Sequence, residues 1–528
     1  MKQRWAPAIW IAVFGLYMLS SGREPAWGDA HPMWDVASHL VEGELATSIR
    51  WPEDLPAGRD GKYYGIAPIG PSIAHVPGVI LAKVGHAVSP KHDALVRPLA
   101  VHLGPSLLGA LACVVFFGLL VDLGLRRQAA SLATAILATS TTVWVYARMP
   151  YSEILQVACF AGTFRAVLRT CREPTRREAL WLGVWAGCLL NAKYVFASAI
   201  VGGLVVVAWT LRKRRAELVT VATWSAVTAL PLVAVALAYN AARWGSVTKT
   251  GYEPYLDAYF GGSVLDGAWG MLLSPNKSAF LYSPPLVLAV LAMPRAYRAQ
   301  PRLGLATLAM VVPTFLVYCT YRSWSGDYAW GPRFFVWAVP VLLVPIAWWI
   351  DQPARWRRIV LAGVVAIGIA VQLLGSALYW DHFIRIAIDA KNQWLGQPNR
   401  KGSYIADKGR GHCDSCFEDT YELLWTPAFQ PIRGHWWLVK SLARGDDPKS
   451  AQADAPWRHY TTLDLNLSAS YPRARIDWWG LLWIEDAPQT RSLGIVVLAV
   501  LVATLALGIW MWLRLHRARE PDPAEPAP

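Results

Sequence analysis

The stretch WAPAIWIAVFGLYMLSSGREPAWGDAHPMWDVASHLVEGE, residues 5–44, decides the fold class of this chain. It opens with an apolar run from Trp5 to about Ser20. Because no small-x-small cleavage site follows and Arg23 interrupts the run early, we interpret it as a retained first membrane helix rather than a signal peptide. The last part of the stretch, residues 28–44, is rich in aspartate, glutamate and histidine. The chain therefore places acidic side chains immediately outside its first membrane crossing.

The composition of the whole chain agrees with a membrane protein. Of the 528 residues, 55% are hydrophobic and 16% are charged, a combination that soluble domains seldom reach. We predict an α-helical polytopic protein with about twelve transmembrane helices, each long enough for about 30 Å of hydrocarbon. Two short runs meet at Asn191, Ala192 and Lys193, which leaves open two tilted helices or one bent element. Besides the first run, the apolar runs lie near residues 99–123, 129–147, 153–168, 179–192, 194–211, 218–240, 279–293, 304–321, 334–350, 359–380 and 492–513.

Basic side chains collect in alternate connections and so indicate the orientation. The positive-inside rule places these connections, and with them both termini, in the cytoplasm. The formal net charge of +14 is mostly this topology signal, since no cluster has the interleaved aromatic residues of a nucleic-acid module. We expect a multi-pass protein of the plasma (inner) membrane that contacts membrane lipids and binds no nucleic acid. The basic clusters lie at residues 126–127, 169–177, 212–215, 295–302, 355–358 and 514–519.

The connections on the other side of the membrane are the long ones. They comprise about residues 22–96, 243–277, 322–333 and 381–490. A channel or transporter usually keeps its polar groups near the middle of the membrane, whereas here they collect on the outer face. In the first of these loops, Pro32 suits the first turn of a helix. The pattern predicts one amphipathic interfacial helix from Pro32 and a second over Pro71–Val88.

Asp29 is the leading candidate for catalysis. It lies where the chain leaves the membrane, ahead of the first interfacial helix. A carboxylate at such a boundary can take a proton from an acceptor hydroxyl when partial desolvation moves its pKa toward the working pH. Asp35, on the polar face of the helix, is a second candidate acid. The alternative that Asp35, His39 and Glu42 form only a solvated helix face stays open here.

Four further segments, taken with the acidic stretch and the two interfacial helices, resemble the GT-C membrane glycosyltransferases. The resemblance is to the phospholipid carrier-dependent branch, related to the protein O-mannosyltransferases, and it covers about residues 1–380. It implies a GT-C-like transmembrane catalytic domain over residues 1–380, with 22–96 as its first outer loop. The segments are YARMPYSEIL (146–155), LAYNAARWGSVTKTGY (237–252), GMLLSPNKSAFLYSPP (270–285) and YRSWSGDYAWGPRFF (321–335).

The resemblance also implies an activity. The donor is a sugar on a polyprenyl phosphate in the outer leaflet, and the acceptor is a hydroxyl of a glycan, lipid or protein. Transfer in one displacement inverts the anomeric centre. Because the leaving group is the lipid phosphate, the site needs cations beside it. The alternative from another class is a non-catalytic transporter or scaffold for lipid-linked sugars that keeps the same fold.

Arg333 leads the candidate phosphate ligands because a guanidinium binds phosphate through two donors. Glu153 is a candidate second catalytic acid, with a helix N-terminal carboxylate as the alternative. Relatives often carry a Lys just before the Pro of the second interfacial helix, whereas this chain has Ala67 before Pro68. Either Lys62 or another cation takes its place, or the chain handles the donor differently. The predicted phosphate ligands are Arg333, Lys277, Lys249, Arg148, Lys62 and Arg322, each with the alternative of contact to lipid headgroups only.

Residues 381–490, the C-terminal segment, contain no crossing and are rich in tryptophan. Alternation in HYTTLDLNLSASY (459–471) and ARIDWWGLLWI (474–484) predicts an extracytoplasmic segment of mixed or β character. The tryptophans suit either acceptor sugars or the membrane interface. Residues 491–513 are the predicted last membrane helix, and residues 514–528 a disordered cytoplasmic tail.

Seven cysteines are present, and two of them form a CxxC pair. Cys413 and Cys416 have no partner pair, so a local disulfide is favoured over a zinc site. No motif for a cofactor occurs. We predict no metal ligands and leave a divalent cation open as a cofactor.

Overall fold

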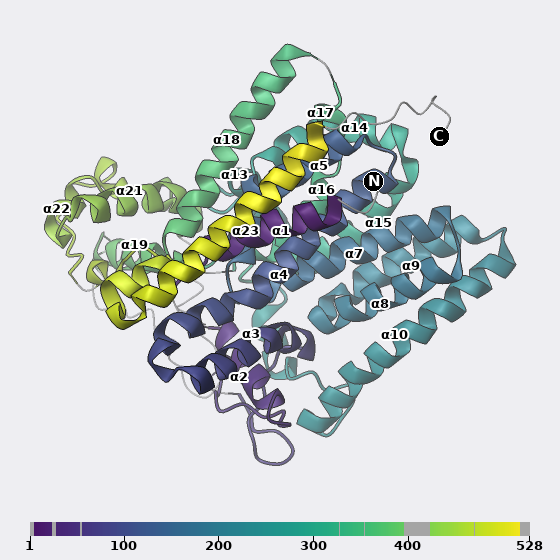
Figure 1. Cartoon of the computed structure of the whole chain (residues 1–528), viewed down its shortest axis with the longest axis horizontal. Coiled ribbons are helices and arrows are strands. Elements are labelled where there is room, and N and C mark those ends of the chain that lie inside the picture. Colours follow the sequence, from purple (N-terminus) through teal and green to yellow (C-terminus); the bar gives the residue numbers. More distant parts are fainter. Residues whose placement is uncertain are drawn as a thin grey trace.

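The structure is a computed structural model that describes residues 5–23, 28–52, 55–326, 328–352, 354–394, 396, 423–468 and 470–517. It is a bundle of helices (Figure 1). Seven helices in the described ranges are long and apolar enough to cross a membrane, which confirms a polytopic helical membrane protein. The number of crossings stays a prediction, although every apolar run coincides with helical structure. The runs correspond to α1 (Trp5–Leu19), α4 (Asp93–Asp122), α5 (Arg127–Ser140) with α6 (Val143–Ala147), α7 (Glu153–Arg172), α8 (Arg176–Ala192), α9 (Ala197–Leu211), α10 (Arg215–Trp244), α14 (Pro285–Ala299), α15 (Pro301–Cys319), η4 (Arg333–Ala338) with α16 (Val339–Leu343) and α17 (Ile346–Ile350), α18 (Arg355–Ala377) and α23 (Arg491–Arg517).

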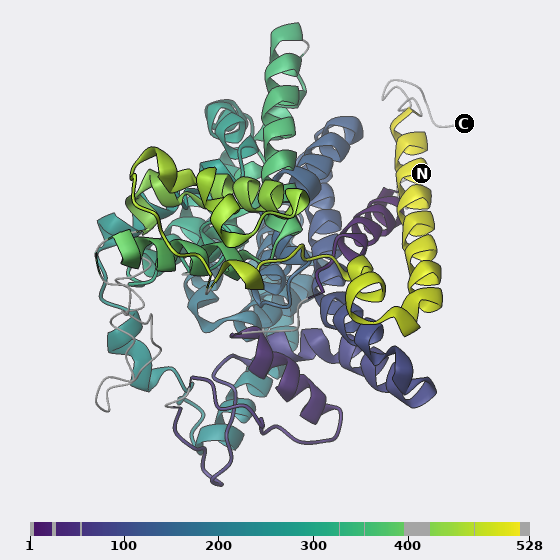
Figure 2. The same ribbon diagram turned by 90° about the vertical axis from the view of Figure 1, so that its left-hand side faces the viewer.

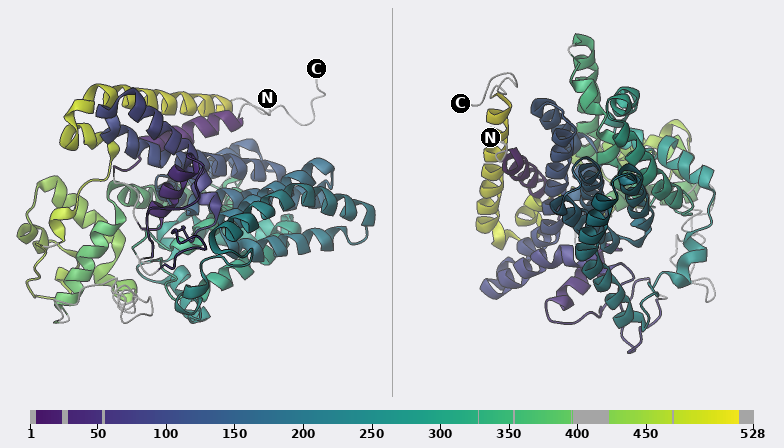
Figure 3. Two further views of the ribbon diagram at one scale, coloured as in Figure 1. Left: turned by 90° about the horizontal axis from the view of Figure 1, so that it is seen from below. Right: turned by 90° about the vertical axis from the view of Figure 1, so that its right-hand side faces the viewer.

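The first and last of these helices, α1 and α23, lie side by side (Figure 3). Their close approach depends on small residues, as is common between membrane helices. A Cβ at Gly15 would lie 2.9 Å from the backbone nitrogen of Leu505, and one at Gly508 would lie 2.3 Å from that of Ala12. Helices α1 and α23, which are distant in sequence, therefore pack tightly against each other. Helix α23 continues to Arg517, beyond the predicted end at residue 513.

The two predicted interfacial helices are present as α2 (Ala30–Leu40) and α3 (Ile69–Val88). They lie together at one end of the bundle (Figure 1). Trp34 and Val79 pack with Val101 of α4 in one buried cluster. Because α2 and α3 pack on the first part of α4, α2 and the preceding residue Asp29 are held against the bundle.

The C-terminal segment forms a second hydrophobic cluster at the side of the bundle (Figure 2). Its described part contains α19 (Trp380–Trp394), α21 (Pro431–Arg444) and α22 (Pro448–Ala453). The prediction of β character is wrong for the described residues, whose only bridge here joins Leu378 and Ile476. Residues 461–467 are extended but pair with no strand, and they alternate because Leu465 and Leu467 are buried on one side. Cys413 and Cys416 lie outside the described residues.

Candidate active site

Three predicted site residues stand at the starts of three separate elements. Asp29 directly precedes α2, Glu153 is the first residue of α7, and Arg333 is the first residue of η4. The loop before Arg333 turns at Gly326, where φ is +70° and an added Cβ would lie 2.5 Å from the Arg333 Cβ. Only glycine suits that position. Gly326 therefore lies close against Arg333 and fixes where its side chain begins.

Arg333 joins the two carboxylates. Its Nη2 donates to Oδ2 of Asp29 at 2.8 Å, and its Nε donates to Oε1 of Glu153 at 2.6 Å. The Tyr151 ring lies under the guanidinium, with its centroid 4.9 Å from Cζ. Exposure differs between the partners, at 2% for the Glu153 side chain and 46% for Asp29. The cluster therefore has a buried structural side at Glu153 and an open side at Asp29.

The pKa of Asp29 moves in the direction opposite to the one expected of a base. Burial by itself raises this pKa, but the charge of Arg333 and the hydrogen bonds from Arg333 and Trp51 together hold it below its ordinary value. The indole Nε1 of Trp51 donates to Oδ1 of Asp29 at 3.2 Å. In this state Asp29 is a stable anion and a weak base. The expected upward shift is wrong while Asp29 is bound to Arg333.

A cavity of about 320 Å³ opens beside Asp29 and Arg333. Its volume lies within the range of small-molecule sites. Lys193 also lines it, with Nζ 4.8 Å from the centroid of the Phe334 ring. Burial is the main cause that lowers the pKa of Lys193 to about 8. The aromatic residues of the wall are Trp51, Tyr194, Tyr239, Tyr252, Tyr259, Phe260, Tyr318, Tyr321 and Phe334.

Lys193 was not among the predicted site residues. The sequence contained a signal for it, because a lysine separated two short apolar runs. The structure shows that the chain leaves α8 at Lys193 before η2 (Tyr194–Phe196) begins. The N-terminus of α3 packs on this junction, since a Cβ at Gly70 would lie 2.5 Å from the carbonyl oxygen of Asn191. Ala67, Pro68 and Lys193 accordingly line one cavity.

Asp35 is not among the residues that line the cavity. Its Oδ2 accepts from the Thr47 hydroxyl at 2.6 Å and from the Ser48 backbone N–H at 2.7 Å. It therefore fastens the loop after α2 to the helix. Lys62 does not line the cavity either, and its 57% exposed side chain has Nζ 4.0 Å from Glu44 Oε2.

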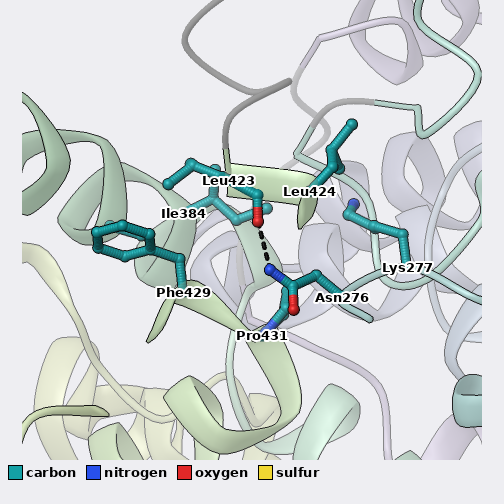
Figure 4. Close-up of a pocket in the computed structure, with 8 residues that line it drawn as sticks. Asn276, Lys277, Ile384, Leu423, Leu424, Phe429 and Pro431 are labelled. Atoms are coloured by element: carbon teal, nitrogen blue, oxygen red, sulfur yellow. Dashed lines mark hydrogen bonds between the residues drawn. The ribbon is translucent and has the colours of Figure 1, made fainter. Parts of the chain in front are cut away.

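Arg148 and Lys277 are buried elsewhere and do not line the cavity. Arg148 Nη2 donates to Asp477 Oδ2 at 3.1 Å, and its Nε donates to the Ser20 carbonyl at 2.5 Å. This pair ties the end of α1 to the segment before α23. Lys277 lines a separate, water-sized hollow (Figure 4), and its Nζ donates to the Ala329 carbonyl. Burial of each charge against fixed partners explains both positions without a ligand.

Lys249 and Arg322 lie near the cavity without lining it. Lys249 is exposed and precedes Thr250, a lining residue. Arg322 is exposed, and its Nε donates to the carbonyl of Phe260, another lining residue, at 3.3 Å. Of the six predicted phosphate ligands, the structure brings only Arg333 into the cavity wall.

A divalent cation stays an untested prediction. The described residues contain no group of three or more His, Cys, Asp and Glu side chains placed to hold one. The guanidinium of Arg333 lies between the carboxylates of Asp29 and Glu153 and pairs with both.

Comparisons with known proteins give distant likenesses. No family model and no curated protein matches the chain. It is similar to the crystal structure of ArnT from Cupriavidus metallidurans bound to undecaprenyl phosphate, at 13% identity and a TM-score of 0.46, over 84% of this chain and 80% of that one. The apo state of ArnT matches at 13% identity and a TM-score of 0.43, over 89% of this chain and 89% of that one. It is also similar to the archaeal oligosaccharyltransferase AglB from Archaeoglobus fulgidus in complex with an inhibitory peptide and a dolichol-phosphate. This match has 12% identity and a TM-score of 0.31, and it covers 99% of this chain and 57% of that one.

Proposed function

We propose that the chain is an integral membrane glycosyltransferase. It moves a sugar from a polyprenyl-phosphate donor to a hydroxyl acceptor on the outer face of the plasma (inner) membrane, for glycosylation of a cell-envelope glycan, lipid or protein. The observation that carries the proposal is the meeting of Asp29 with Arg333, 304 positions away, at a cavity that also contains Lys193. A base and two cations beside one cavity supply the groups that transfer from a lipid phosphate needs.

Lys193 and Arg333 bind the donor phosphate in this proposal. Both are cationic, and both line the cavity. Lys193 replaces the lysine that relatives carry before the Pro of the second interfacial helix, because it shares the cavity wall with Ala67 and Pro68. Lys193, at the junction of α8 and η2, binds the same phosphate that the lysine before the second interfacial helix binds in the relatives.

The aromatic wall fits the rest of the donor. Aromatic rings offer faces for a sugar, and apolar side chains suit a prenyl chain. Leu256 and Val317 line the cavity and are also 46% and 37% exposed. The wall therefore reaches the apolar outer surface of the bundle. We assign the prenyl chain to this opening, which allows the lipid to remain in the membrane while its phosphate lies at Arg333.

Donor binding also prepares the base. A phosphate on Nη2 of Arg333 takes the place of the Asp29 carboxylate. Freed from the guanidinium, Asp29 loses the Arg333 contact, which lowers its pKa more than any other contact does, while burial continues to raise that pKa. The acceptor oxygen then forms its bond to the anomeric carbon as the bond from that carbon to the phosphate oxygen breaks. The acceptor proton passes to Asp29, and the charge that develops on the lipid phosphate is stabilised by Arg333 and Lys193.

The test is transfer from synthetic polyprenyl-phosphate sugars by the full chain in nanodiscs. Mass spectrometry of envelope glycans and lipid-linked sugars from a deletion strain selects the donor and acceptor. Asp29→Asn should abolish transfer while donor binding persists, and Asp35→Asn on the same helix is the matched control. A transporter or scaffold would transfer no sugar with any donor, and that result would refute the proposal.

A further inference from the structure

Tyr151 contacts both Arg333 and the residues that lead from the bundle into the C-terminal segment. Its ring face lies against the guanidinium, 4.9 Å from Cζ. Its hydroxyl lies 3.3 Å from the hydroxyl of Tyr379. One side chain thus connects the catalytic cluster to a residue 228 positions further along the chain.

Tyr379 stands where the bundle passes into the C-terminal segment. It lies between the end of α18 at Ala377 and the start of α19 at Trp380. The neighbouring Trp380 ring also packs on Tyr151, with centroids 5.4 Å apart. The corner is held by the backbone N–H of Asp477, which donates to the Ala377 carbonyl at 2.8 Å. Tyr379 is 8% exposed and Trp380 is 3% exposed, so both are fixed by packing.

We propose that Tyr151 and Tyr379 are positioning residues for Arg333, through which the C-terminal segment sets the orientation of the phosphate-binding guanidinium. The inference rests on the proposed function. It assigns to the C-terminal segment a direct part in donor transfer, in addition to any contact with the acceptor.

The need for such a support follows from the contacts of Arg333. In the free protein, two carboxylates bind the edges of the guanidinium, the Tyr151 ring lies nearest to its face at 4.9 Å, and the Phe334 ring lies further away at 5.6 Å. When a donor phosphate replaces Asp29, Glu153 and Tyr151 remain as the supports. Glu153 fixes one edge of the planar group, and the ring fixes the tilt of its plane, which decides whether two donors reach the phosphate together. The Tyr379 hydroxyl in turn limits rotation of the Tyr151 ring.

Tyrosine-to-phenylalanine variants isolate the hydroxyl contact. Tyr151→Phe and Tyr379→Phe each remove the same bond, so each should lower kcat by about 3- to 10-fold. The double variant should be no slower than either single one. Tyr471→Phe is the matched control, because it removes another hydroxyl bond of a buried tyrosine, to the Asp446 carbonyl at 3.1 Å, and Tyr471 does not line the cavity. That control should keep wild-type kcat.

A double-mutant cycle separates positioning from general stability. Tyr151→Leu removes the ring and should lower kcat by about 10- to 30-fold in the wild-type background. In the Arg333→Lys background it should lower kcat by less than about 2-fold, because no guanidinium plane is left to orient. Multiplicative losses in the two backgrounds would overturn the inference while leaving the transferase itself intact. Absence of transfer by the wild-type chain with every donor would instead refute the proposed function.

Discussion

Asp29→Asn is the perturbation that tests the catalytic cluster most directly. Asparagine keeps the shape of the side chain and can still accept from Trp51, but it cannot take the acceptor proton. Loss of a general base lowers turnover by about 100- to 10,000-fold. The thermal stability of the protein should change little, since the Asp29 side chain is 46% exposed and its pair with Arg333 is weakened by solvent.

The same exposure sets the expected change in donor binding. An exposed ion pair contributes about 0.2 to 1 kcal/mol. In the free protein the Asp29 carboxylate competes with the donor phosphate for Nη2 of Arg333, so its removal should strengthen donor binding by at most about 5-fold. We therefore expect the Asp29→Asn variant to lose sugar transfer and to bind the lipid phosphate as tightly as the wild type or more tightly.

Two assays on full-length protein in nanodiscs measure the pair of effects. Transfer of labelled sugar gives kcat, and calorimetric titration with polyprenyl phosphate gives the dissociation constant. Asp35→Asn serves as the control, because Asp35 accepts hydrogen bonds from the loop after α2 and does not line the cavity. Wild-type turnover in Asp29→Asn would refute Asp29 as the base. Weaker lipid phosphate binding in that variant would refute its competition with the donor.

Other predictions follow from the same contacts. Arg333→Ala should weaken donor binding and lower the free energy of unfolding by about 3–5 kcal/mol, because Glu153 stays buried without its cation; unchanged thermal unfolding in detergent would contradict this. Arg333→Lys should recover donor binding only in part, since an ammonium cannot make both contacts. Because the Lys193 pKa of about 8 means that its charge is lost as pH rises through that value, kcat/KM should fall above about pH 8 in the wild type and not in Lys193→Arg. A cysteine at Gly43 should react with an impermeant reagent in intact cells and one at Lys213 should not; the reverse pattern would refute the orientation.

The local sequence was sufficient to predict the helices. Each apolar run corresponds to helical structure, and both interfacial helices occur where amphipathic spacing predicted them, because hydrophobic length and periodicity are properties of neighbouring residues. The same reasoning failed for residues 459–471. Their alternation reflected burial of Leu465 and Leu467 on one side of an extended segment, and no partner strand lies beside them in the described residues. Alternation records which side of a chain is buried, and a strand also needs a partner from elsewhere.

The sequence also determined the chemical types at the site, since it singled out Asp29 after the first apolar run, and Glu153 and Arg333 within the segments 146–155 and 321–335. Only the tertiary structure decided which cations meet them. Lys193 enters the cavity because α3 packs on the end of α8, whereas Arg148 is buried against Asp477. The pKa of Asp29 likewise depends on Arg333, a residue 304 positions away. Charge and hydropathy are local properties, but the partner of a buried charge is set by packing between distant segments.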